Sequence, residues 1–181
     1  MGYSQSKIDE LGGLDVIIQG VSSRGHTGFN EPGSPTDSKT RLVTLDRSTI
    51  ISAASDFYGE KNVPRKAITM GIGTMFKAKK VFLLAWGEGK APIIKKIVEE
   101  EKTDHVPASI LQDHKDATII LDEASADELT RVKTPWIVDI PKWDEEMIKK
   151  GVVWLCQKVN KPILKLTNSD YNNHHMNDLV T

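Results

Sequence analysis

The chain has 181 residues, 39% of them apolar and 27% charged, with a formal net charge of −1. That length fits one domain with a core of its own, and the near-neutral charge argues against the basic field that holds nucleic acid or an anionic membrane. A single cysteine, a polar start and the lack of an apolar run near the ~20 residues of a membrane span indicate no internal disulfide, secretion signal or transmembrane helix, so we expect a cytoplasmic protein.

Short apolar runs alternate with helical patterns along the chain. A helix end is expected at 6–11, where two glycines follow. Buried strands are expected at 14–18 and 81–86, and further strands at 41–45 and 117–121. Helices are expected at 46–57, at 74–78, after Gly87 and Gly89 with Ile93, Ile94, Ile97 and Val98 on one stripe, at 124–129, and around Met147 to Leu155. Alternating strands and helices predict an α/β fold with a mostly parallel sheet.

The pattern fades from Lys158 onward. Residues 162–166 could form one more strand, and the polar, asparagine-rich residues 168–177 are expected to be loose. The adjacent pair His174 and His175 lies near two aspartates, but no second ligand cluster accompanies it. We interpret this segment as a solvated tail rather than a metal site.

The loop at residues 21–39 is the most informative segment. Loops of about twenty residues in a compact domain are usually functional or disordered, and this one directly follows an expected buried strand, where ligands of parallel α/β sheets bind. His26 can give or take a proton near neutral pH, and Glu31 could orient its imidazole. Spacing alone leaves two interpretations open: an acid–base pair, or a solvated loop with an incidental histidine.

Residues 25–34, Gly-His-Thr-Gly-Phe-Asn-Glu-Pro-Gly-Ser, closely resemble the GHxxFNEPxS signature of glucosamine-6-phosphate deaminases. Three further segments agree with motifs of that family in order and spacing: 40–45 (TRLVTL), 63–74 (VPRKAITMGIGT) and 83–91 (LLAWGEGKA). The resemblance runs from about Tyr3 to Trp136. It is strongest to the long Bacteroides-type members, which carry a second, deacetylase-like domain after the deaminase.

The resemblance implies a three-layer α/β/α, Rossmann-like domain of the deaminase/sugar-phosphate isomerase superfamily, with its N-terminal part missing. Residues 1–140 would be the C-terminal portion of that domain, and residues 141–181 a helix followed by a linker or tail. The implied activity is glucosamine-6-phosphate deaminase, which isomerises glucosamine 6-phosphate and releases fructose 6-phosphate and ammonia in amino-sugar catabolism. Neither a cofactor nor a metal is expected, the implied partner is an amino-sugar phosphate, and the family's habit implies a homo-oligomer.

The same resemblance implies roles for individual residues. His26 would open the pyranose ring, and Glu31 would orient and charge-balance it. Lys90 matches the lysine that binds the substrate phosphate, and its place after a glycine turn at a helix start also suits an anion. Ser34 and Arg41 correspond to residues that bind the effector in regulated members.

The chain departs from the family pattern at several positions. Arg24 stands where the family usually has an acid, and a cation there would oppose an imidazolium at His26. Ser55 replaces an arginine that helps to hold phosphate, and Val43 replaces a lysine of the effector set, which argues against allosteric control. The missing part would carry the first phosphate loop and the base for the C2 proton, so we expect weak catalysis from this chain alone.

Two other functions remain as alternatives. A 6-phosphogluconolactonase-like hydrolase shares the fold and a Gly-His loop, but those proteins continue with a Ser-Leu-Phe-Pro type sequence where this chain has residues 29–32, Phe-Asn-Glu-Pro. A non-catalytic sugar-phosphate-binding or assembly module is the second alternative, and Arg24 and Ser55 are the residues that favour it.

Overall fold

The computed structural model describes residues 2–180, with side chains from Gln5 onward. The chain forms two compact units, Met1–Ala126 and Asp127–Thr181, which we call the sheet unit and the C-terminal unit. Met1 and Thr181 lie outside the described residues. The expected division into residues 1–140 and 141–181 refers to domains of the resembled family and stays a prediction.

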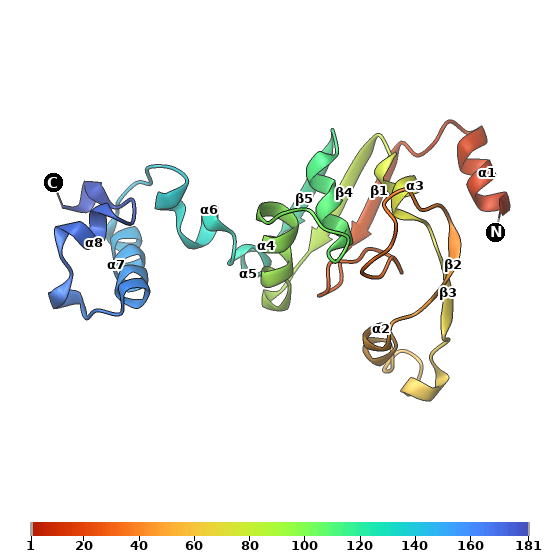
Figure 1. The fold of residues 1–181 in the computed structure, drawn as a ribbon, viewed down its shortest axis with the longest axis horizontal. Coiled ribbons are helices and arrows are strands. Elements are labelled where there is room, and N and C mark those ends of the chain that lie inside the picture. The colour runs from red at the N-terminus through yellow and green to blue at the C-terminus, as the bar shows by residue number, and fades with distance from the viewer. Residues whose placement is uncertain (1, 181) are drawn as a thin grey trace. The chain divides into compact units, whose positions relative to one another are not determined.

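A parallel three-stranded sheet forms the centre of the sheet unit (Figure 1). Its strands, in spatial order, are β1 (Val16–Gly20), β4 (Lys80–Ala85) and β5 (Ala117–Leu121). Gly20 lies beside Leu84 at the carboxyl ends of β1 and β4, so the loop after β1 and the turn after β4 begin at the same edge. This parallel sheet confirms the expected fold class.

The two faces of this sheet differ because side chains alternate along each strand. On one face Val81 and Leu83 of β4 are both 0% exposed. On the other face Ile18 of β1 is 69% exposed, and Ile120 of β5 is also exposed. Helices of the sheet unit therefore cover one face, and the second face is apolar and uncovered among the described residues.

A separate antiparallel ribbon joins β2 (Arg41–Thr44) to β3 (Lys66–Thr69), as Figure 1 shows. The sequence predicted β2 but not β3, because the four residues KAIT of β3 include few apolar side chains that would indicate a strand. Helix α2 (Arg47–Ser52) ends at Ala53 instead of continuing to Phe57, because the chain then makes successive tight turns. Leu45, Ile50 and Val63 form a small core beside the ribbon.

The other helices of the sheet unit are α1 (Gly2–Glu10), α3 (Ile72–Phe76), α4 (Ala91–Glu99) and α5 (Glu123–Ala126). The expected stripe of α4 is confirmed at Ile93, Ile94 and Ile97, which are buried, whereas Val98 is 38% exposed. Helix α3 begins before the expected Thr74, and α5 ends before residue 129. Short 3-10 helices lie at Glu60–Asn62, Glu88–Lys90 and Pro107–Asp113.

The C-terminal unit contains α6 (Thr130–Lys133), α7 (Glu145–Val159) and α8 (Asn168–Asn172), with 3-10 helices at Pro135–Ile137, Ile163–Lys165 and Asn177–Leu179. Trp136, Leu155 and Met176 form its buried core. Two expectations were wrong. Residues 162–166 form a 3-10 turn rather than a strand, and the tail is ordered, because a capping box starts α8 and Met176 is fully buried.

Within residues 2–180, no helix combines the length and the apolar character that a membrane span requires.

Candidate active site

The loop after β1 is folded by a tight turn that places His26. The amide of Gly25 donates to the Ser22 carbonyl, and the amide of Ser22 donates to the His26 carbonyl, at 3.0 Å each. Gly25 has φ +79°, and a Cβ there would lie 2.6 Å from a methyl carbon of Val106. Only glycine meets both conditions without strain, so the Gly-His pair of the signature has a structural reason.

A second glycine shapes the other side of the histidine ring. Gly28 has φ +56°, and a Cβ there would lie 2.9 Å from the Thr69 hydroxyl. The Gly28 carbonyl lies 3.0 Å from Nδ1 of His26. A carbonyl can only accept a hydrogen bond, so Nδ1 is the donor and the proton of the neutral imidazole belongs on Nδ1. Nε2 is left to face other partners.

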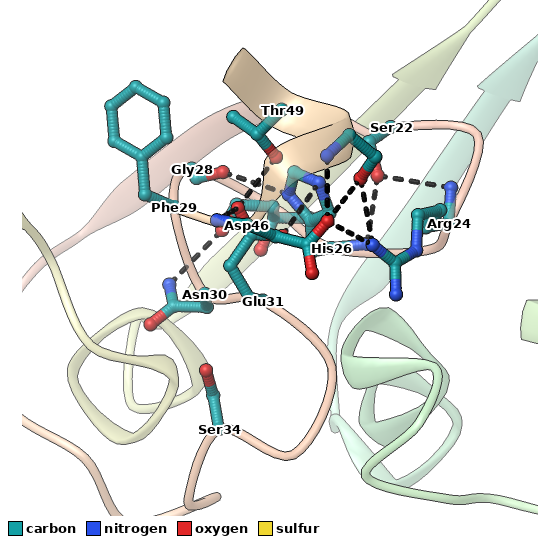
Figure 2. Close-up of polar contacts among 12 residues, drawn as sticks. Ser22, Arg24, His26, Gly28, Phe29, Asn30, Glu31, Ser34, Asp46 and Thr49 are labelled. Carbon is teal, nitrogen blue, oxygen red and sulfur yellow. Dashed lines mark hydrogen bonds and ion pairs between the residues drawn. The ribbon is translucent and has the colours of Figure 1, made fainter. Parts of the chain in front are cut away.

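Glu31 is the partner that the fold brings to Nε2 (Figure 2). The distance from His26 Nε2 to Glu31 Oε2 is 3.4 Å, and the two side chains are only 10% and 14% exposed. Oε2 is buried and has no hydrogen-bond partner among the described residues. A proton on Nε2 would turn this contact into a charge-assisted hydrogen bond.

The other oxygen of Glu31 is bound firmly. Oε1 accepts a hydrogen bond from the Thr49 hydroxyl at 2.6 Å and a longer one from the Asp46 amide at 3.3 Å. Both donors belong to the start of α2, where Asp46 is the N-cap residue. The sequence interpretation named neither of them as part of the site, because only the tertiary structure brings α2 to Glu31.

Arg24 turns toward α2 in the structure. Its Nη1 donates to Asp46 Oδ1 and to the Ser48 hydroxyl, each at 2.7 Å. Hydrogen bonds from the Ser48 side chain and amide, together with Arg24, hold the pKa of Asp46 below its usual value. The guanidinium at the family's acidic position therefore has a carboxylate of its own, which offsets its charge near His26.

Asn30, Ser34 and Arg41 form a second polar cluster. Asn30 is 0% exposed, and its amide group donates to the carbonyls of Thr27 and Met70. Arg41 donates from Nη1 to Asn30 Oδ1 at 2.9 Å and from Nη2 to the Ser34 hydroxyl at 3.1 Å. Ser34 and Arg41, the two expected effector-site residues, are thus hydrogen-bonded to each other, and Arg41 also ties the loop to β2 through Asn30.

One hollow beside this loop lies on the side of the second cluster. A cavity of about 290 Å³ is lined by Phe29, Glu31, Pro32, Gly33, Ser34, Pro35, Arg41, Val43 and Thr44. Lys90 is not among these residues. Its Nζ instead donates to the Val21 carbonyl at 2.7 Å, which places the ammonium where β1 leads into the loop. In the structure His26 therefore contacts Glu31, and Ser34 contacts Arg41. Lys90 contacts Val21, the first residue of the loop.

Asp122, which directly follows β5, is a further polar residue that contacts the turn after β4, and the sequence interpretation did not select it. Its carboxylate accepts hydrogen bonds from the amides of Gly87 and Ser125. Hydrogen bonds from Ser125 and Gly87 hold its pKa below the usual value. Asp122 therefore fixes the turn that carries Lys90. Among the described residues, no group of three or more His, Cys, Asp or Glu side chains gathers as metal ligands would.

Comparison with known proteins places these observations in a family. The model of the family "Glucosamine-6-phosphate isomerases/6-phosphogluconolactonase" matches residues 3–120. The chain belongs to this family. The match contains the signature loop, the start of α2 and the Lys90 turn, so His26, Glu31 and Lys90 all lie within the matched residues.

Two relatives show how much of a longer protein this chain matches. A glucosamine-6-phosphate deaminase-like protein of Bacteroides thetaiotaomicron is 44% identical over 176 residues, which are 97% of this chain and 26% of that protein. The glucosamine-6-phosphate deaminase of Lacticaseibacillus paracasei is 49% identical over 118 residues, 65% of this chain and 50% of that enzyme. The chain thus spans half or less of the length of these relatives.

Solved structures agree with the family assignment. A monomeric glucosamine-6-phosphate deaminase superimposes with a TM-score of 0.68 at 37% identity, over 70% of this chain and 53% of that one. The 6-phosphogluconolactonase of Trypanosoma cruzi reaches 0.55 at 24% identity, over 71% of this chain and 50% of that one. The lactonase likeness shows a shared fold only.

Proposed function

We propose that this chain provides the histidine–glutamate site of a glucosamine-6-phosphate deaminase, which converts glucosamine 6-phosphate to fructose 6-phosphate and ammonia. The observation that carries the proposal is the contact between His26 Nε2 and the buried, unpartnered Oε2 of Glu31, 3.4 Å apart. An imidazole held by a carboxylate is the arrangement that general acid–base catalysis requires. The family match and the named deaminases among the relatives support the choice of substrate.

The residues would act at different points of the reaction. With Nδ1 fixed by the Gly28 carbonyl, Nε2 of His26 would take the proton of the anomeric hydroxyl and deliver it to the ring oxygen as the bond between C1 and that oxygen breaks, which opens the ring. Glu31 would stabilise the imidazolium that carries this proton. Transfer of a proton from C2 to C1 then gives an enolamine and an imine, and water releases ammonia from the imine.

Lys90 would bind the phosphate group. Its ammonium has three N–H donors, and one of them is used by the Val21 carbonyl. The remaining donors can meet phosphate oxygens at the carboxyl edge of the sheet, where anions bind in α/β folds. We further propose that the protein works in the cytoplasm, as a homo-oligomer, with residues 1–140 as the domain portion and 141–181 as its C-terminal extension.

Two departures from the family pattern, Arg24 and Ser55, favour a second candidate, a sugar-phosphate-binding module without turnover. Arg24 replaces the acid of the family, and Ser55 replaces a phosphate-holding arginine. Because Arg24 is paired with Asp46, its cost to an imidazolium at His26 is reduced, and we favour the enzyme.

Release of ammonia and fructose 6-phosphate separates the two candidates. The assay is run on this chain and on a version extended at its N-terminus with the preceding segment of its relatives, together with binding of glucosamine 6-phosphate. We expect turnover that His26→Asn and Glu31→Gln each reduce on the order of a hundred- to ten-thousandfold. Binding without turnover in both versions would support the module, and the absence of both would contradict either function.

A further inference from the structure

The two oxygens of the Glu31 carboxylate have opposite environments, as Figure 2 shows. Oε1 accepts two hydrogen bonds, of which the one from Thr49 is short at 2.6 Å. Oε2 has none, although it is buried, and it lies beside His26 Nε2. A carboxylate rotates about its last bond with little resistance, so something must keep Oε2 rather than Oε1 at the histidine.

The Thr49 hydroxyl is the group that does this. A hydroxyl has a single hydrogen, and at 2.6 Å from a carboxylate oxygen that hydrogen is committed to Glu31. The residue is held in place independently, because the next residue, Ile50, is buried against Leu45 and Val63. The position of the hydroxyl therefore follows from the packing of α2 and not from Glu31.

We propose that Thr49 is a positioning residue that acts through Glu31: its hydroxyl fixes the carboxylate so that the unpartnered Oε2 faces His26 Nε2. This role deepens the proposed deaminase function and rests on it for its consequence in catalysis. The Asp46 amide assists from 3.3 Å, so removal of the hydroxyl weakens the alignment without abolishing it. Among the described residues, the Thr49 hydroxyl bonds to Glu31 and forms no hydrogen bond with the histidine ring or with Lys90.

A purely structural role for Thr49 is the alternative, in which it simply ties α2 to the loop. Other bonds already make that connection. Arg24 of the loop reaches Asp46 and Ser48 at the start of α2, at 2.7 Å each. The loop and α2 should therefore stay together when the Thr49 hydroxyl is lost.

The test compares Thr49→Val, which keeps the shape but removes the hydroxyl, with Thr49→Ser, which keeps the hydroxyl. Ser48→Ala is the matched control, because it removes a hydroxyl from the same helical turn. The Ser48 hydroxyl bonds Arg24 and Asp46 but not Glu31. The readout is the ¹⁵N NMR spectrum of the His26 ring in the full chain, which reports Nδ1 and Nε2 separately and requires no turnover.

We expect Thr49→Val to move the Nε2 signal while Nδ1 stays bonded to the Gly28 carbonyl, Thr49→Ser to restore the wild-type spectrum, and Ser48→Ala to leave it unchanged. In whichever version of the chain is active, Thr49→Val should lower kcat about tenfold to a hundredfold, as expected for one lost hydrogen bond to a charged group, with KM unchanged. If Thr49→Val does not fold, Thr49→Ala removes the same hydroxyl with less steric demand.

The outcomes separate this inference from the proposed function. A wild-type His26 spectrum in folded Thr49→Val or Thr49→Ala overturns the positioning role, even if the chain is an active deaminase. A shifted Nε2 signal that serine restores supports the positioning role, even if no deamination is found. Equal effects of Ser48→Ala and Thr49→Val would assign Thr49 to general support of α2 and would also overturn the inference.

Discussion

The sheet unit and the C-terminal unit bury their apolar side chains in different ways. In the sheet unit one face of the β1-β4-β5 sheet is buried at Val81 and Leu83, while Ile18 and Ile120 on the opposite face are exposed. In the C-terminal unit Trp136, Leu155 and Met176 close a small core, which further aromatic residues surround. The C-terminal unit thus completes its core with its own residues, whereas the sheet unit builds a site on a sheet of which only one face is covered.

The uncovered face of the sheet raises the question of what holds the candidate site in place. The signature loop is tied to α2, β2 and the β3 end by paired polar groups, including the fully buried Asn30. None of these bonds comes from the exposed sheet face. The site geometry can therefore be present in this chain even though an apolar face of its sheet lies open.

The largest effect is expected from the covered face. Leu83→Ala should cost the sheet unit about 3 kcal/mol in free energy of unfolding, since it removes a fully buried side chain and leaves a cavity. At concentrations where the chain is monomeric, Ile18→Ala, the matched change on the exposed face, should cost less than about 0.5 kcal/mol. Amide hydrogen exchange of β4 measures the sheet unit separately. Equal costs would mean that the exposed face is covered in solution.

A second, smaller effect concerns association through the exposed face. An apolar face of this kind favours contact with a second copy of the chain. Placing lysines on it through Ile18→Lys and Ile120→Lys should weaken self-association about tenfold or more, because each buried isoleucine contributes about 2 kcal/mol. Sedimentation over a range of concentrations measures this. Unchanged association would place the contact elsewhere on the chain.

The smallest effect concerns acid, and it tests the C-terminal unit alone. Hydrogen bonds from Lys161, the Thr167 amide and the Thr167 hydroxyl lower the pKa of Asp170 to about 2 from 3.8. Because the folded-state pKa is depressed, the stabilisation is present above pH 3.8 and is lost as the pH falls through about 2. Asp170→Asn should therefore destabilise the C-terminal unit at pH 7 and approach the wild type below pH 2.

Tryptophan fluorescence of the C-terminal unit follows this acid titration, since Trp136, Trp143 and Trp154 are in ring contact there. A constant difference between wild type and Asp170→Asn from pH 7 to 2 would show that the carboxylate charge plays no part. The exposed face of the sheet unit should not affect this result, because the Asp170 contacts lie within one unit.

Local pattern explains which parts of the fold could be predicted. Strand β5 was predicted at its observed bounds because its run of apolar residues is short and sharply delimited. The buried stripe of α4 followed from helical spacing. Strand β3 and the ordered tail were missed because their stability comes from partners far along the chain: β3 is completed by β2, and Met176 packs beneath α7, where a Cβ at Gly151 would lie 2.6 Å from it.

The candidate site divides in the same way. His26 and Glu31 could be selected because they lie five positions apart in one loop and belong to the signature. Thr49 could not, since its contact with Glu31 spans eighteen residues and depends on how α2 packs. The pairing of Arg24 with Asp46 could likewise not be predicted from the sequence. Sequence pattern identifies the reacting groups, and the tertiary structure identifies the residues that hold them.

The most direct test of the central claim is a titration of the ¹⁵N-labelled chain with glucosamine 6-phosphate, followed by NMR. The account predicts that signals of the His26 ring and of Lys90 change together and saturate at the same ligand concentration. Lys90→Met should remove the change at His26, whereas Lys149→Met in the C-terminal unit should leave the changes at His26 and Lys90 intact. Saturable changes confined to the C-terminal unit, or none at His26 and Lys90, would contradict the account.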